Sequence, residues 1–220
     1  MRANRPEDRP EKPRRARAMA SRVADASRLA AAILAGAFSR RAVRPQQAEA
    51  RGALPGDELL RDPKLRLTHG VTIKGPAAEI WRWLIQMGCR RAGWYSYDGL
   101  DNGGVPSSDR ILAELQHAAV GDVFPWAPTA EGGFTVLALE PERLLVLGDA
   151  AHTVTWAFAL GPLDETHTRL LTRVSVSRGH ALAAVLFALF WRPIHFGMQR
   201  RQLLNLKRRV EAAAPARAIG

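Results

Sequence analysis

The sequence HTVTWAFALGPLDETHTRLLTRVSVSRG, residues 152–179, indicates the fold more clearly than any other part of the chain. Large apolar residues alternate with small or polar ones on both sides of GPLDETH, as they do in β-strands that bury one face. The turn-forming residues of GPLDETH predict a hairpin between these two strands. Upstream, GDVFPWAP and GGFTVLALEPERLLVLGD contain three more strand-like runs, with EPER as another turn. We therefore expect five strands from Gly121 onward.

A further strand and two helices are expected before this region. LRLTHGVTI (residues 65–73) also alternates, with one face formed by Leu65, Leu67, His69, Val71 and Ile73. Gly75-Pro76 then introduces PAAEIWRWLIQMG, whose apolar residues have helical spacing, and Gly88 suits the end of that helix. SSDRILAELQ (residues 107–116) predicts a second, short helix with Ser107 or Ser108 as its cap.

The last part of the chain is expected to be helical. ALAAVLFALFW (residues 181–191) is an uninterrupted apolar run, and PIHFGMQRRQLLNLKRRVEAA (residues 193–213) is a long amphipathic helix. The inward stripe of that helix is formed by Phe196, Gln199, Leu203, Leu206 and Val210. The order of elements predicts an α+β fold, in which a curved antiparallel sheet holds its longest helix on the concave face and leaves a cavity between them.

This order and several local motifs resemble the START-like superfamily, also called SRPBCC or helix-grip proteins, and in particular its bacterial polyketide cyclase/dehydrase-like members. The resemblance covers roughly residues 54–210 and rests on LPGDELLRDP (54–63), IWRWLIQMG (80–88), GWYSYDGLDN (93–102), SSDRILAELQ (107–116), VGD (120–122), TWAFALGPL (155–163), TRLLTR (168–173) and MQRRQLLNLKRR (198–209). It implies a helix-grip domain over residues 54–212 that binds a hydrophobic or amphipathic small molecule, such as a lipid or a polyketide-like compound, under the C-terminal helix. In some relatives polar groups in the cavity perform cyclisation or dehydration.

Residues 1–50 differ from this domain in composition and are expected to form a disordered basic arm with a short amphipathic helix. Residues 1–51 hold 13 Arg or Lys against 5 Asp or Glu, so they carry +8 of the net charge of +11. Residues 1–20 are expected to be disordered because they contain few large apolar residues, and the tail 213–220 is expected to be disordered too. The apolar run 29–38 is too short to span a bilayer, which takes about 20 residues. It predicts a short amphipathic helix that packs on the domain or lies on an anionic membrane surface, with export or membrane insertion as the less favoured alternative.

The candidate ligand-binding residues come from three regions. In GWYSYDGLDN, the rings of Trp94, Tyr95 and Tyr97 either cap the core or close a pocket, with Asp98 and Asp101 holding the turn. Arg173 interrupts an apolar strand and faces either solvent or the acidic head of a ligand. The full set of expected ligand-binding residues is Trp94, Tyr95, Tyr97, Trp156, Phe158, Arg173, Phe196 and Gln199.

The candidates for catalysis are fewer. An enzyme of the cyclase/dehydratase kind would use Tyr97, Asp98 or His195 for acid–base work. The histidines are scattered and no phosphate-binding glycine motif occurs, so we expect no metal and no cofactor. The single Cys89 excludes an internal disulfide and is expected to serve packing.

Three functions therefore stay open from the sequence: a binding protein for a hydrophobic small molecule, an enzyme acting on such a ligand, and an accessory protein at a membrane surface. The expected partners are the small molecule and an anionic membrane contacted through residues 1–51, rather than a specific nucleic acid. The expected location is the cytoplasm, including the inner face of the membrane.

Overall fold

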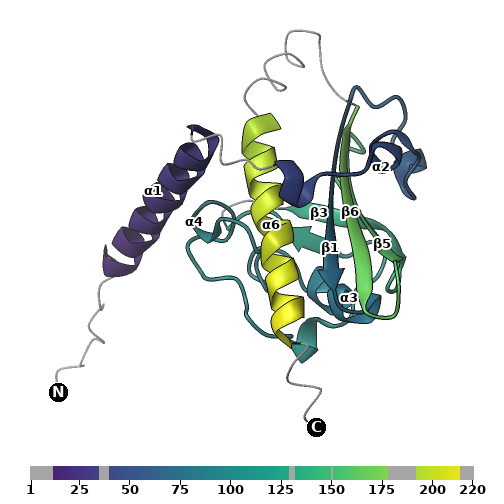
Figure 1. Ribbon diagram of the computed structural model, residues 1–220. Helices are drawn as coiled ribbons and strands as arrows, with labels where there is room; N and C mark the ends of the chain where they lie inside the picture. The colour runs from purple at the N-terminus through teal and green to yellow at the C-terminus, as the bar shows by residue number, and fades with distance from the viewer. Residues whose placement is uncertain (1–11, 35–39, 129–131, 150, 178–191, 214–220) are drawn as a thin grey trace, which may run out of the picture.

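The computed structural model describes residues 12–34, 40–128, 132–149, 151–177 and 192–213 (Figure 1). Its centre is a six-stranded sheet in the order β1-β6-β5-β4-β3-β2, and every neighbouring pair is antiparallel. The strands are β1 (Leu65–Lys74), β2 (Val123–Pro125), β3 (Gly133–Glu140), β4 (Leu144–Gly148), β5 (Val154–Pro162) and β6 (His167–Val176). The five strands expected after Gly121 are confirmed, and β1 pairs with the last of them along its whole length.

Along the chain, the helices precede β1, lie between β1 and β2, or follow β6. The α-helices are α1 (Lys12–Leu34), α2 (Gln47–Arg51), α3 (Ala77–Ile85), α4 (Asp98–Asp101) and α6 (Arg192–Ala213), and short turns of tighter helix are η1 (Arg40–Val43), η2 (Asp57–Leu59) and η3 (Ala113–Leu115). Helix α6 lies across one face of the sheet (Figure 1). This arrangement is a helix-grip fold. The apolar run 181–191 lies outside the described residues.

The inward stripe predicted for the last helix is confirmed. Gln199, Leu203, Leu206 and Val210 are buried, and Phe196 packs against the same core. Leu203 and Leu206 are 0% exposed, and full burial of a leucine side chain contributes roughly 1.5–3 kcal/mol. The stripe therefore anchors α6 on the sheet.

The helix expected over residues 107–116 is wrong, because only η3 is helical there. The reason is a tertiary contact that the local sequence does not contain. The buried side chain of Gln86 donates to the carbonyl oxygen of Arg110 (3.2 Å) and accepts from the backbone N–H of Leu112 (3.0 Å). These bonds take the backbone groups that a helix would have used.

The face of the sheet opposite α6 is covered by residues 52–64, between α2 and β1, which we call the covering segment. Gly56 lies so close to β4 that a Cβ there would come within 2.6 Å of a methyl group of Val146. The Arg173 side chain points to this face, where it forms an ion pair with Asp57 and donates to the carbonyl oxygens of Glu49 (2.8 Å) and Gly52 (3.0 Å). The expectation that Arg173 faces solvent or an acidic ligand is corrected: its side chain is 1% exposed and holds the covering segment.

Helix α1 begins at Lys12, within the segment expected to be disordered, and is longer than the helix predicted from the apolar run. It packs beside α4 (Figure 1). The carboxylate of Asp25 accepts a hydrogen bond from the backbone N–H of Gly99 (2.8 Å), and Leu29 is buried. These contacts explain its attachment to the domain. Among the described residues, no helix has the length and apolar character needed to cross a membrane.

Candidate functional site

The inner face of the sheet carries polar side chains opposite the first turns of α6. His69 on β1 pairs with Thr172 on β6, which pairs in turn with Phe158 on β5. Directly paired residues of antiparallel strands project to the same face, so the three side chains form a row. The row meets α6 at Phe196, whose ring centroid lies 5.3 Å from that of His69.

Two indole rings extend this row along β5. The ring of Trp156 lies 4.8 Å from that of Phe158 and stacks on Trp94 at 5.4 Å, with an interplanar angle of 23°. Trp94 comes from the loop between α3 and α4, and its Nε1–H donates to the carbonyl oxygen of Pro125 (3.2 Å). The aromatic stretch after α3 is thereby attached to the centre of the sheet.

Two glutamines of α6 connect Trp94 to the helix. The Nε2 of Gln202 donates to the backbone carbonyl oxygen of Trp94 (3.0 Å), and its Oε1 accepts from Nε2 of Gln199 (2.7 Å). Gln199 stands one helical turn after Phe196, on the same side of α6. Starting from His69, each residue is thus the neighbour of the next until Phe196 returns to His69.

We call these eight residues the interface cluster: His69, Thr172, Phe158, Trp156, Trp94, Gln202, Gln199 and Phe196. They come from three strands, one loop and α6, and they lie between the sheet and that helix.

Four polar atoms of the interface cluster are buried without a hydrogen-bond partner among the described residues. They are Nδ1 of His69, Oγ1 of Thr172, Nε1 of Trp156 and Oε1 of Gln199. Buried polar atoms in folded proteins are nearly always paired, and leaving one unpaired costs roughly 1–3 kcal/mol. The interface cluster therefore holds four polar atoms whose hydrogen-bonding capacity the described residues leave unused.

The interface cluster is uncharged at neutral pH. Burial, with a smaller contribution from His195, lowers the pKa of His69 to about 3. Burial also lowers the pKa of His195, whose ring lies 5.9 Å from that of His69, to about 4. Both imidazoles are therefore neutral hydrogen-bonding groups under physiological conditions.

The structure brings together five of the eight ligand-binding residues expected from the sequence, namely Trp94, Trp156, Phe158, Phe196 and Gln199. The other three lie elsewhere. Arg173 is on the opposite face of the sheet, as described above. Tyr95 is a core residue whose hydroxyl accepts from Gln86 (2.8 Å) and donates to the carbonyl oxygen of Trp83 (3.2 Å).

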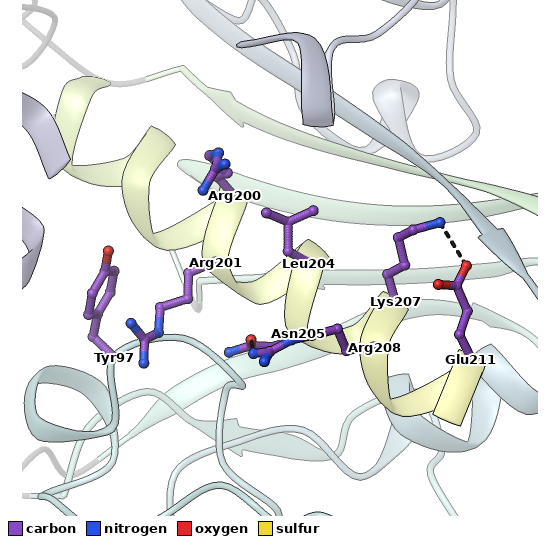
Figure 2. A pocket seen from close by; sticks show the side chains of 8 residues that line it. All are labelled: Tyr97, Arg200, Arg201, Leu204, Asn205, Lys207, Arg208 and Glu211. Atoms are coloured by element: carbon purple, nitrogen blue, oxygen red, sulfur yellow. Dashed lines mark hydrogen bonds and ion pairs between the residues drawn. The ribbon is translucent and has the colours of Figure 1, made fainter. Parts of the chain in front are cut away.

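Tyr97 lies on the outer side of α6, beside a surface hollow of about 470 Å³ (Figure 2). The guanidinium of Arg201 lies 4.4 Å from the centre of the Tyr97 ring. Two other basic residues there are engaged within the protein: Lys207 pairs with Glu211 (2.7 Å), and Arg208 donates to Asn205. The hollow is therefore a polar groove of the helix surface, separate from the interface cluster.

The three residues considered for catalysis have different surroundings. Asp98 accepts a hydrogen bond from Ser107, Tyr97 lies under Arg201, and His195 lies beside His69. Cys89 is buried, and burial raises the pKa of its thiol, which fits the packing role expected for it.

His69, Thr172 and Gln202 belong to the interface cluster but are not among the site residues expected from the sequence. A usable signal existed for the first two, since each is a polar residue at an inward position of an alternating strand. Gln202 carried no such signal, because its role depends on the carbonyl of a residue 108 positions earlier in the chain.

Comparison with known proteins gives distant structural similarity and no function. No protein-family model matches this chain, and no match to a curated protein was found. Among solved structures, similarity is found to the KanY protein (16% identity, 67% of this chain and 97% of that chain, TM-score 0.43). Similarity is also found to a conserved protein of unknown function from Enterococcus faecalis (15% identity, 69% of this chain and 75% of that chain, TM-score 0.41). A polyketide-cyclase-like protein from Corynebacterium glutamicum is similar too (14% identity, 68% of this chain and 91% of that chain, TM-score 0.36). At these identities the site has to be assigned from the side chains of this chain. The order and pairing of its own elements give the chain the helix-grip fold of START-like (SRPBCC) proteins.

Proposed function

We propose that this protein binds a largely apolar small molecule between the sheet and α6, at the interface cluster. The observation that carries the proposal is the set of four unpartnered polar atoms among aromatic side chains. Small-molecule sites are mostly apolar and aromatic, with a few polar groups that orient the ligand. The interface cluster has this composition.

Binding without turnover fits the cluster better than cyclase or dehydratase chemistry. A general acid or base works best when its pKa lies near the operating pH. The pKa values of His69 and His195, at about 3 and about 4, are far below neutrality. No carboxylate belongs to the interface cluster, so proton transfer would lack a suitably tuned partner there.

Native mass spectrometry of the full-length protein, purified gently from its own cells, tests the proposal. The expected result is an added mass that disappears on denaturation and is reduced in Trp156→Phe. Tyr97→Phe is the matched control, since it also changes one polar aromatic residue but lies on the outer side of α6. Equal retention of the added mass in both variants would place the ligand elsewhere.

We also propose that α1 brings the protein to anionic membranes. Two observations support this second function. Met19 and Val23, one helical turn apart, are 68% and 58% exposed, while Asp25 and Leu29 on the other side of α1 are buried. Residues 1–51 also carry a net charge of +8. Exposed apolar residues combined with basic ones favour binding at the surface of an anionic bilayer.

Sedimentation with vesicles tests this second function. The full-length protein is expected to pellet with phosphatidylserine-containing vesicles, less so with pure phosphatidylcholine and less so at high salt. The double variant Met19→Ser, Val23→Ser should lose most of this association. If the variant pellets as well as the wild type, the exposed side of α1 does not contact lipid.

A further inference from the structure

The hydrogen-bonding polarity of the interface cluster restricts the chemistry of its ligand. This step rests on the proposed binding function and deepens it. The orientation of each amide can be assigned from its partners, because a carbonyl oxygen only accepts and an indole N–H only donates.

The orientation of Gln199 follows from a chain of hydrogen bonds that starts at Trp94. The backbone carbonyl of Trp94 requires a donor, so the Gln202 amide presents Nε2 to it. The Oε1 of Gln202 is then the acceptor for Nε2 of Gln199. The remaining polar atom, Oε1 of Gln199, is buried and can only accept a hydrogen bond. A ligand that satisfies it must present a donor.

Trp156 imposes the opposite requirement. Its buried Nε1–H has no partner among the described residues, and an indole nitrogen can only donate. A ligand that satisfies it must present an acceptor. Thr172 and neutral His69 can each pair with a donor or an acceptor of the ligand, because a hydroxyl rotates and an imidazole has two tautomers. These two residues tolerate further oxygen atoms without fixing their type.

Charge is excluded on separate grounds. Burying a carboxylate is costly unless a cation pairs with it. No member of the interface cluster is cationic, and Arg173 and Arg169 are used on the opposite face of the sheet by Asp57 and Glu49. An acidic ligand such as a fatty acid would therefore find no counter-charge for its carboxylate among the members of the interface cluster.

We infer that the ligand of the interface cluster is an uncharged molecule with an apolar frame that carries both a hydrogen-bond donor, such as a hydroxyl group, and an acceptor, such as a ketone oxygen. Gln199 receives the donor and Trp156 meets the acceptor. Hydrocarbons and carboxylic acids of the same size bind less well.

Calorimetric titration with five bicyclic probes of one size tests this inference: tetralin, tetralone, tetrahydronaphthol, hydroxytetralone with its hydroxyl remote from the ketone, and tetrahydronaphthoate. In the full-length protein hydroxytetralone should bind most tightly. Loss of either its hydroxyl or its ketone should weaken binding roughly tenfold, as expected for one buried hydrogen bond. Tetrahydronaphthoate should bind no better than tetralin.

Two variants separate the two requirements. Gln199→Met should remove the preference for the hydroxyl and keep the preference for the ketone, whereas Trp156→Phe should do the reverse. If Gln199→Met does not fold, the ketone preference lost in Trp156→Phe still tests half of the inference.

The outcomes distinguish this inference from the proposed function. Tighter binding of tetrahydronaphthoate or of tetralin than of hydroxytetralone overturns the inference and leaves a binding site for apolar molecules. Lack of binding by all five probes overturns the proposed function together with the inference.

Discussion

Thr168 and Thr172 lie four residues apart on the same face of β6 and are each 1% exposed, but their hydroxyl groups are treated differently. The hydroxyl of Thr168 donates to the carbonyl oxygen of Gly75 (2.8 Å). The hydroxyl of Thr172 has no partner among the described residues. One strand thus carries both a threonine whose hydroxyl bonds the backbone and a threonine of the interface cluster whose hydroxyl has no partner among the described residues.

This difference predicts opposite effects of one substitution. Thr172→Val should raise the free energy of unfolding of the ligand-free protein by about 1 kcal/mol, because it removes an unpaired buried hydroxyl. Thr168→Val should lower it by about 1 kcal/mol, because it leaves the Gly75 carbonyl without its donor. Urea unfolding of both variants measures the two values. Destabilisation of equal size in both would mean that the Thr172 hydroxyl is satisfied in the folded protein.

Arg173 should matter for stability and not for ligand binding. Arg173→Met leaves Asp57 without its partner and the covering segment without several hydrogen bonds, so a loss of about 3 kcal/mol is expected. Lys64→Met is the control, because the Lys64–Asp62 pair is exposed and such pairs contribute about 0–1 kcal/mol. Denaturant unfolding and probe titration of both variants check this. Weaker probe binding in a still-folded Arg173→Met protein would contradict the placement of Arg173 on the face of the sheet opposite the interface cluster.

His69 should make the protein sensitive to acid. Its pKa is lowered to about 3, so the unfolded chain binds a proton at this residue below about pH 6.5 while the folded protein does not. The stability contributed by neutral His69 is therefore lost as the pH falls from that value towards about 3. His69→Phe should reduce the loss of unfolding free energy between about pH 7 and about pH 5. Curves of equal slope for the variant and the wild type would count against a neutral, buried His69.

Asp101 should have the opposite effect, over a largely overlapping pH range. Burial, together with the charges of Asp98 and Asp25, raises its pKa to about 7. The folded protein then holds a proton that the unfolded chain releases above about pH 4, so stability falls as the pH rises from there to about 7. Asp101→Asn should flatten this decline and be the more stable form at about pH 8. Parallel stability curves across this range would show that Asp101 titrates normally.

Periodicity explains which parts of the fold could be predicted from the sequence. The five C-terminal strands and the inward stripe of α6 repeat their apolar residues at regular intervals, and the structure has both. Regions held by distant partners could not be predicted in this way. Gln86 determines the backbone of residues 110–112, and Asp57 determines the environment of Arg173 from 116 positions away.

The candidate site, too, could be predicted from the sequence only where the signal is local. The aromatic members Trp94, Trp156 and Phe158 were recognisable because polar aromatics and alternating strands are visible locally. That neither neighbouring tyrosine joins them was not recognisable. Tyr95 has a positive φ of 58° and turns its side chain into the core beside α3, and Tyr97 lies at the outer hollow of α6. A left-handed backbone conformation at a non-glycine residue depends on the surrounding structure more than on the residue itself.

The most direct test of the account is the proton–nitrogen correlation spectrum of the tryptophan side chains, recorded with and without hydroxytetralone. The Trp156 indole signal is identified by its loss in Trp156→Phe. This signal is expected to move downfield as its N–H gains an acceptor. The signal of Trp126, which is 40% exposed and outside the interface cluster, is expected to keep its position. Movement of the Trp126 signal with no change at Trp156 would show that the molecule binds outside the helix–sheet interface.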